Sequence, residues 1–599
     1  SQEYSMSSFI NPSLIPSLNQ ADLELCESLS TCGQKEVLAS FTTPEQIKNF
    51  LDDARMVNAN YPGGVSKYVD TAKGLLRDSA QNVNAFDGFK VEIPSGVNLD
   101  YKKGDFDELE KLGKDMLKDT GFSLVGGGIG ERLHSKFIKL SLTSDLVRNQ
   151  TFLEDYCNYI HAIEMEYGSI NPFAIMTSDG THNGILSMLQ KNNYYGLHPE
   201  HVTLMKQNGV PALKNAACEI ATKEDGHIIL KPHGHGDIHL LMSQNHLPTQ
   251  WRQLGKKYVI FFQDTNGLSM HGYSILLGVA EKFGFDYCSM TIVRRPGEKV
   301  GGICRLVNEH GEALTCNVEY NQLEGVLKSS TGAGDVANAE GNSNYPGNIN
   351  LLCIRLANYE EVLARSGGVV SEFVNPKYAD ATRTAFLSPV RLECMMQDYP
   401  KLLFGSPSPV GFVSLPRWLC FSAVKNSREN GIKQGKATGY PESFFSGEED
   451  IYKFYRRVLR QCGVQVGDAA YDEALTPAVG LPRFPLVALT SRSGLTTSDM
   501  VTHFGKNVVI RDKSVLIVDG KDVHFEDFVL DGALTVKACD GAKVTIRNCT
   551  IQNKSWHAEE VDENDEAVEE RYALRGYMLV KDETRELVFD KPGEYVIEC

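Results

Sequence analysis

The chain has no long hydrophobic run, no excess of basic residues and no closely paired cysteines. Its longest apolar runs, such as YVIFF at 258–262, are far shorter than the ~20 residues that a membrane-spanning helix needs. The formal net charge of −17 argues against nucleic acid or an anionic membrane as the main partner, because both require a basic surface. The 14 cysteines form no C-x-x-C pair, which is typical of buried thiols in a reducing compartment. No secretory signal is recognisable at the start, so we expect a cytoplasmic protein.

A chain of 599 residues is too long for a single core, and its patterning divides it into three regions. Residues 1–118 carry helical patterning with polar starts, as in SLNQADLELCESL and TTPEQIKNFLDDARMV, and predict a mainly helical domain. Residues 119–484 alternate helical stretches with short apolar segments, the pattern of a doubly wound α/β sheet: FSLVG, PFAIMT, HIILK, YVIFFQ and DYCSMTIV. Residues 485–599 consist of short alternating segments separated by Gly and Asp, which predict a β-helix-like domain.

Residues 231–240 read KPHGHGDIHL, and they raise two competing hypotheses. Closely spaced histidines could be the ligands of a zinc hydrolase. The alternating glycines indicate instead that the main chain comes close to a ligand, which needs no metal. The H-x-H-x-D-H spacing of a di-zinc hydrolase would require histidine where Ile238 stands. We therefore expect a nucleotide-contacting loop without a tightly bound metal, and keep the hydrolase as a remote alternative.

A glycine-rich loop follows the first strand of the α/β region, in FSLVGGGIGERLHSKFIKL at 122–140. Successive glycines let main-chain N–H groups face a phosphate, and Arg132, Lys136 and Lys139 supply positive charge. The loop is neither a dinucleotide-binding G-x-G-x-x-G nor a P-loop, because Glu131 and Leu133 stand where glycine is needed and G-K-[ST] is missing.

The loop GGGIGERLHSKFIK resembles that of the eukaryotic UDP-sugar pyrophosphorylases, although His134 and Phe137 replace two glycines of the family loop. The resemblance continues in the same order through further blocks over some 300 residues: MTSDGTH, LMKQ, PHGHGDIH, FFQDTNGL, NVEYNQL, YPGNIN, SEFVNPKY, RLECMMQDYPK and AVKN. It implies a central doubly wound, Rossmann-like domain of the nucleotidyltransferase type A kind, with a C-terminal β-helix. It also implies a reaction in which UTP and a sugar 1-phosphate form a UDP-sugar and pyrophosphate, reversibly and with Mg²⁺.

The resemblance assigns the phosphate contacts to basic residues. In-line displacement at the α-phosphorus needs two anions brought together and charge neutralised rather than a protein nucleophile. Lys139 matches the lysine that contacts the UTP phosphates, with Arg132 supporting the leaving pyrophosphate. Lys425, in AVKN, matches the lysine that meets the phosphates from the far side, and Lys377, in VNPKY, is a weaker candidate that we group with the sugar site.

The same resemblance implies the remaining site residues. Gln207 matches the residue that reads uracil, and its amide could donate to and accept from the imide edge at once. The nucleotide would also contact Gly127, Gly128, Gly234 and His235, and the sugar would contact Asn266, Glu319, Asn348 and Asn350. Asp264, at the end of a strand, is the predicted Mg²⁺ ligand, although Asn266 falls nearest to the metal-binding aspartate of related enzymes.

Three alternatives stay open besides the hydrolase. The chain could be a UDP-glucose or a UDP-N-acetylhexosamine pyrophosphorylase of narrow specificity, or a non-catalytic UDP-sugar binding protein. The expected partners are the small-molecule substrates UTP and sugar 1-phosphate, with no nucleic acid and no membrane. We expect a monomer, with the C-terminal β region as a possible interface.

Overall fold

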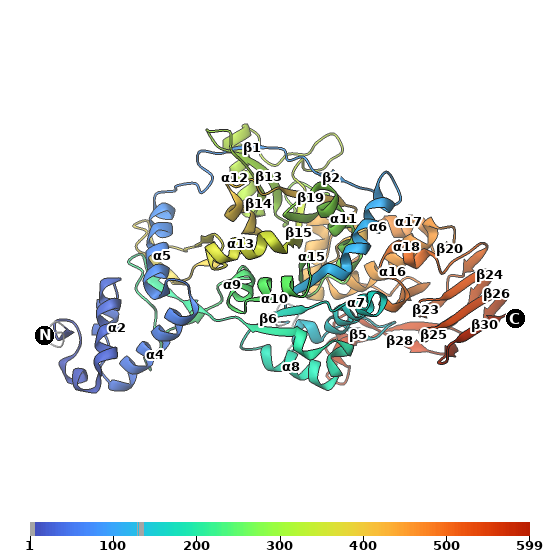
Figure 1. Ribbon diagram of the computed structural model, residues 1–599, viewed down its shortest axis with the longest axis horizontal. Helices are drawn as coiled ribbons and strands as arrows, with labels where there is room; N and C mark the ends of the chain where they lie inside the picture. Colours follow the sequence, from blue (N-terminus) through green and yellow to red (C-terminus); the bar gives the residue numbers. More distant parts are fainter. Residues whose placement is uncertain (1–5, 129, 131–136) are drawn as a thin grey trace.

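The computed structural model describes residues 6–128, 130 and 137–599. Its first helices begin where the sequence supplies capping residues. Asn19 caps α2 (Gln20–Thr31) and Thr43 caps α4 (Pro44–Asn60), each through a reciprocal capping box. Both helices were predicted and are confirmed. With α5 (Gly64–Ala80), they form a separate core with β9 (Leu213–Asn215) and neighbouring residues of the central region, at the opposite end of the molecule from the C-terminus (Figure 1).

The central sheet runs in the order β2-β19-β12-β15-β11-β3-β6-β7. Four of its strands are parallel neighbours: β11 (Tyr258–Gln263), β3 (Thr120–Val125), β6 (Phe173–Thr177) and β7 (Val202–Lys206). β15 (Gly347–Arg355) runs antiparallel between β11 and β12 (Tyr287–Ile292). The parallel strands therefore end at one edge, where α/β sheets bind their ligands.

Helices cover both faces of this sheet. Phe122 and Ile260 pack with α7 (Phe152–Tyr167) and α11 (Tyr273–Phe283), whereas Val259 and Phe261 pack with α9 (Asp237–Gln244) and α13 (Leu356–Ser366). Alternate residues of one strand thus lie in two different cores, which explains why these strands are apolar throughout. The doubly wound α/β arrangement is confirmed.

Two sequence expectations need correction here. HIILK is not a strand of the central sheet: only β10 (Leu230–Lys231) forms, paired with β8 (Val210–Pro211) in a two-stranded ribbon. β1 (Lys90–Glu92) and β2 (Val97–Asn98) pair with β13 (Gly302–Val307) and β19 (Val410–Leu415) of the central sheet. Residues 90–98, which the patterning grouped with the N-terminal helices, therefore belong to the central sheet.

The C-terminal strands alternate between two parallel sheets. One contains β21 (Leu486–Leu489), β23 (Val515–Asp519), β25 (Ala533–Ala538) and β29 (Arg585–Phe589). The other contains β20 (Gln465–Val466), β22 (Val508–Ile510), β24 (Val523–Asp531), β26 (Ala542–Gln552) and β30 (Gly593–Ile597). Their apolar side chains continue the core that lies under α7 and α11.

Two further observations concern cysteines and membranes. A disulfide joins Cys549 of β26 to Cys599, which the expectation of free thiols throughout did not foresee, and the other twelve cysteines are unpaired. In the part of the chain that the structure describes, no helix combines the length and hydrophobicity required to cross a membrane.

Candidate functional site

The glycine loop leaves the carboxyl end of β3 and returns at Lys139. The N–H of Lys139 donates to the carbonyl of Gly128 (3.2 Å). A Cβ atom on Gly128 would lie 2.8 Å from Asp264 Oδ2 and 2.9 Å from Lys139 Cδ. Any larger residue at position 128 would therefore displace both side chains. Arg132, predicted to act beside Lys139, lies outside the described residues.

Lys425 lies on another loop that is joined to the segment carrying Asp264. The N–H of Val424 donates to the carbonyl of Thr265 (3.0 Å), and Thr265 Oγ1 donates to the carbonyl of Val424 (2.9 Å). These two hydrogen bonds join the segment after β11 to the segment that carries Lys425. Burial raises the pKa of Asp264, and the charges of Lys139 and Lys425 oppose that rise. Both predicted lysines thus lie near enough to the predicted metal ligand for their charges to act on it.

Glu442, which the sequence analysis did not identify, holds Lys425 in place. Its carbonyl accepts from the N–H of Lys425 (2.9 Å), and its carboxylate lies 3.8 Å from Lys425 Nζ. Because the side chain of Lys425 is still 43% exposed, its ammonium group remains accessible to an anion. The motif block AVKN contains nothing that predicts this partner.

Asn266, a predicted sugar contact, has structural hydrogen bonds and also lines a small cavity with Asn350 and Lys425. It is buried, its Nδ2 donates to the carbonyl of Cys420 (2.9 Å), and its Oδ1 accepts from the N–H groups of Leu268 (3.2 Å) and Ser422 (3.0 Å). These bonds anchor the turn after Asp264 and use one of the two amide hydrogens, so contact of Asn266 with the sugar stays a prediction.

The three histidines of KPHGHGDIHL have three different environments. His233 is buried, with Nδ1 2.6 Å from Asp237 Oδ1 and Nε2 2.6 Å from Glu372 Oε2. His239 is also buried, and burial lowers its pKa to about 4. Nδ1 of His235 accepts from the N–H of Met396 (3.0 Å), and burial, together with the charge of Lys425, lowers the pKa of His235 to about 4.

The glycines of this segment pack closely against Cys394. A Cβ atom on Gly234 would lie 2.4 Å from the carbonyl oxygen of Cys394, and one on Gly236 would lie 2.7 Å from Cys394 Sγ. Gly234 also has a φ of +105°, a conformation that side chains other than glycine rarely adopt. Close approach to Cys394 therefore requires glycine at both positions, and contact of this loop with uridine stays a prediction.

Gln207 lies at the end of β7, beside this loop. Its Nε2 donates to the carbonyl of Gly234 (2.8 Å) and to Asp237 Oδ2 (3.1 Å). Both amide hydrogens are therefore committed, so the predicted simultaneous donation to and acceptance from a base is not possible in this arrangement. Only Oε1 is left to accept a hydrogen bond from a ligand.

Of the other predicted sugar contacts, Glu319, Asn348 and Asn350 lie around two small neighbouring cavities. Lys377 lies elsewhere. Nδ2 of Asn348 donates to Oδ1 of Asn350 (2.8 Å), and Asn350 lines a small cavity together with Lys425. Glu319 accepts from Gln397 Nε2 (3.2 Å), and Gln397 lines a second small cavity with Asn348. Lys377 is exposed in a segment next to the N-terminal helices, where the hydroxyl of the following Tyr378 donates to Ser79.

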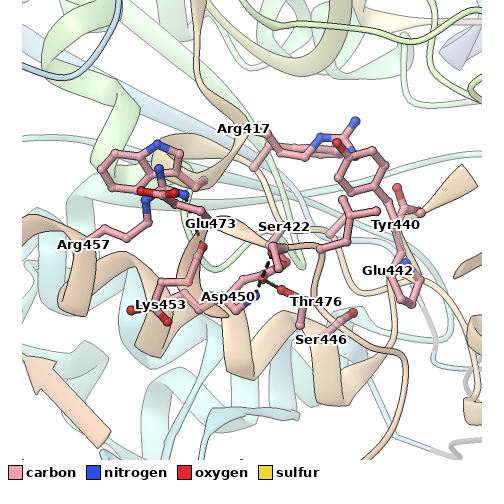
Figure 2. A pocket seen from close by; sticks show the side chains of 18 residues that line it. Arg417, Ser422, Tyr440, Glu442, Ser446, Asp450, Lys453, Arg457, Glu473 and Thr476 are labelled. Carbon is pink, nitrogen blue, oxygen red and sulfur yellow. Dashed lines mark hydrogen bonds between the residues drawn. The ribbon is translucent and has the colours of Figure 1, made fainter. Parts of the chain in front are cut away.

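A larger cavity of about 200 Å³ is lined in part by residues 417–423, the segment that leads to Lys425 (Figure 2). The guanidinium group of Arg417 stacks on the ring of Tyr440, 3.3 Å from its centroid. Ser422 Oγ donates to Asp450 Oδ2 (2.7 Å), and Thr476 donates to the other carboxylate oxygen. Asp450 thus anchors the chain three residues before Lys425.

A buried ion pair supports the segment that follows Lys139. Glu448 of α16 (Phe444–Gln461) accepts from the N–H of Leu146 (2.6 Å) and from the hydroxyls of Tyr452 (2.6 Å) and Tyr577. Nε of Arg575 lies 3.1 Å from Glu448 Oε1, and both side chains are fully buried. Arg575 also donates to the carbonyl of Thr143. Arg575 of the C-terminal region therefore contacts the segment that directly follows the glycine loop.

Comparison with known proteins shows which proteins this chain resembles. The family model for UTP–glucose-1-phosphate uridylyltransferase matches residues 75–326. The chain is 37% identical to a UDP-sugar pyrophosphorylase of Oryza sativa subsp. indica, over 96% of this chain and 95% of that one. It is 36% identical to the UDP-sugar pyrophosphorylase of Arabidopsis thaliana, over 97% and 96%. A crystal structure of the uridine diphosphate N-acetylglucosamine pyrophosphorylase of Trypanosoma brucei superposes with a TM-score of 0.60 at 18% identity, covering 81% of this chain and 95% of that one, and is similar in fold.

The fold, the glycine loop and these matches define a nucleotidyltransferase. The chain belongs to the UDP-sugar pyrophosphorylase family.

Proposed function

We propose that the chain transfers the uridylyl group of UTP to a sugar 1-phosphate, forming a UDP-sugar and pyrophosphate, and that it catalyses the reverse reaction. A phosphate oxygen of the sugar 1-phosphate attacks the α-phosphorus, and the bond between the α-phosphorus and its bridging oxygen to the β-phosphorus breaks. The observation that carries this proposal is that Lys139 and Lys425, from separate loops, both lie near enough to the buried Asp264 carboxylate for their charges to act on it.

The chain's own contribution is electrostatic. Lys139 would contact the phosphates of UTP, and Lys425 would meet them from the opposite side, so that charge on both the incoming and the departing oxygens is neutralised. Arg132 would support the leaving pyrophosphate. A binding protein without catalytic activity has no need for ammonium groups on two sides of one phosphate, which argues against that alternative.

We also propose that Asp264 ligates Mg²⁺. One carboxylate with substrate phosphates and water suits this ion, because Mg²⁺ keeps several waters in most protein sites. Asp264 lies directly against the glycine loop, which supports a shared position for phosphate and metal. When bound, the ion would neutralise charge on the phosphates. The neighbouring ammonium groups would disfavour a cation in the absence of UTP, so the ion should bind together with the nucleotide.

The nucleotide would lie between the glycine loop and the end of β7. Gly127 and Gly128 would offer main chain to the phosphates and base, Gln207 would accept from the uracil N3–H through Oε1, and His235 would hydrogen-bond ribose or phosphate. The hydrolase alternative would place a metal ion on His233, Asp237 and Cys394, whose ligand atoms lie within 4.8 Å of one another, whereas we propose that His233 instead hydrogen-bonds two carboxylates.

We propose that the sugar is bound by Asn266, Glu319, Asn348 and Asn350, and that several sugars are accepted, including glucose and galactose. We further propose a β-helix for residues 485–599, supported by the alternation of strands between two parallel sheets, as well as a monomeric state and a cytoplasmic location.

A pyrophosphorolysis panel tests the proposal. The protein is supplied with pyrophosphate, Mg²⁺ and one of several UDP-sugars, and the formation of UTP is followed. We expect turnover of both UDP-glucose and UDP-galactose, with some activity on pentose or uronic acid relatives. Turnover of UDP-glucose alone, or of N-acetylated sugars alone, would establish one of the narrow-specificity alternatives, and no UTP from any of them would refute the proposed reaction.

A further inference from the structure

A chain of hydrogen bonds connects Gln207 to the N-terminal helices. Gln207 Nε2 donates to Asp237 Oδ2 (3.1 Å), and the other oxygen of Asp237 lies 2.6 Å from His233 Nδ1. His233 Nε2 lies 2.6 Å from Glu372 Oε2, and the hydroxyl of Tyr61 donates to Glu372 (2.8 Å). Tyr61 follows α4, so this series of hydrogen bonds begins in the N-terminal helical region and ends at the edge of the central sheet.

The groups in this series of hydrogen bonds can be assigned as donors and acceptors in one way. Both ring nitrogens of His233 face carboxylates, and only the imidazolium form can donate to both. Burial alone would lower the pKa of His233, but its hydrogen bonds to Asp237, Cys394 and Glu372 raise it well above the ordinary value. Asp237 Oδ1 faces this donor, and Asp237 Oδ2 accepts from Gln207 Nε2.

This arrangement determines which way the Gln207 amide faces. The carbonyl of Gly234 and the carboxylate of Asp237 are both acceptors, so the amide nitrogen must face them. Reversing the amide would place Oε1 against two acceptors and lose both hydrogen bonds. Oε1 is therefore directed away from this pair, and within the part of the chain that the structure describes no donor is recorded for it.

We propose that Asp237 and His233 are positioning residues that make the site select uracil over cytosine, by holding the Gln207 amide with its oxygen toward the base. Uracil presents a donor at N3 and cytosine presents an acceptor, so a fixed acceptor on the protein pairs with uracil alone. A site whose hydrogen-bonding group is fixed discriminates strongly against a ligand that leaves this group unpaired. The inference rests on the proposed UTP site.

The first test is the ratio of kcat/KM for UTP to that for CTP, with glucose 1-phosphate and Mg²⁺ held constant. Asp237→Asn replaces an obligatory acceptor by a group that can also donate, so the reversed amide gains a partner. We expect this ratio to fall by about tenfold or more, with a larger change in KM for UTP than in kcat. Glu372→Gln removes the second carboxylate from His233, and we expect a smaller fall of several-fold.

Tyr378→Phe is the matched control, because it removes a tyrosine hydroxyl that donates to Ser79 of the N-terminal helices without belonging to this chain of hydrogen bonds. Its ratio should equal that of the wild type. Thermal unfolding of each variant shows whether the fold is intact. A folded Asp237→Asn with an unchanged ratio overturns the inference, and if that variant does not fold, an unchanged ratio in Glu372→Gln overturns it. A wild-type protein that makes no UDP-sugar from UTP refutes the proposed function instead.

Discussion

Replacing Arg575 by Met should loosen the segment that follows Lys139. The substitution keeps most of the side chain's length but removes the guanidinium group that pairs with Glu448. The Glu448 carboxylate would keep three neutral donors, from Leu146, Tyr452 and Tyr577, without a compensating positive charge. The carbonyl of Thr143 would also lose its donor.

The magnitude follows from burial, because both members of the pair are fully enclosed. Breaking a buried ion pair by removing one partner destabilises by about 3–5 kcal/mol, since a charge is left buried alone. At 1.36 kcal/mol per factor of ten, the population of locally open molecules should rise roughly 10²- to 10⁴-fold. Opening of this segment also displaces Lys139, so kcat should fall as well.

Amide hydrogen exchange measures this opening directly, and residues 139–151 and 571–580 should exchange faster by that factor. Arg547→Met is the matched control, because the ion pair of Arg547 with Glu598 is exposed and lies in the same C-terminal region. Exposed pairs contribute little, so exchange in the control should change by no more than about fivefold. Equal protection of both segments in the wild type and in Arg575→Met would refute the reasoning.

Two further predictions concern the nucleotide site. Lys139→Ala should lower kcat by about 10²- to 10³-fold and weaken UTP binding less, because its charge acts chiefly in the transition state. Single-turnover rates and equilibrium binding separate the two effects, and a near-normal kcat would contradict the assigned role. His235→Ala should raise the UTP concentration required for activity without changing metal content. Elemental analysis of dialysed wild-type protein should find no stoichiometric zinc, and about one ion per chain, lost in the variant, would restore the hydrolase alternative.

Local sequence patterns predicted the elements whose signals are local. The helices that begin after Asn19 and Thr43 carry their caps within three residues, and β3, β6, β11 and β12 are apolar runs bounded by turn residues. HIILK is also a run of apolar residues, but only its last two residues form a strand, which pairs with β8 outside the central sheet. Which strand it pairs with depends on the tertiary fold, and a local pattern does not contain that information. β1 and β2 are too short to be recognised, and they form only because β13 and β19 are present to pair with them.

The residue types of the site, and the family to which they point, could be read from motif order alone. Lys139, Lys425, Asp264 and Gln207 each lie in a short block with a recognisable pattern. What each side chain does was decided by contacts between distant segments. The oxygen and one amide hydrogen of Asn266 are hydrogen-bonded to residues 268 and 420–422, and both amide hydrogens of Gln207 are hydrogen-bonded to the loop at 234–237. A motif specifies which donors and acceptors a chain carries, whereas only the packed structure determines which of them remain unpaired for a ligand.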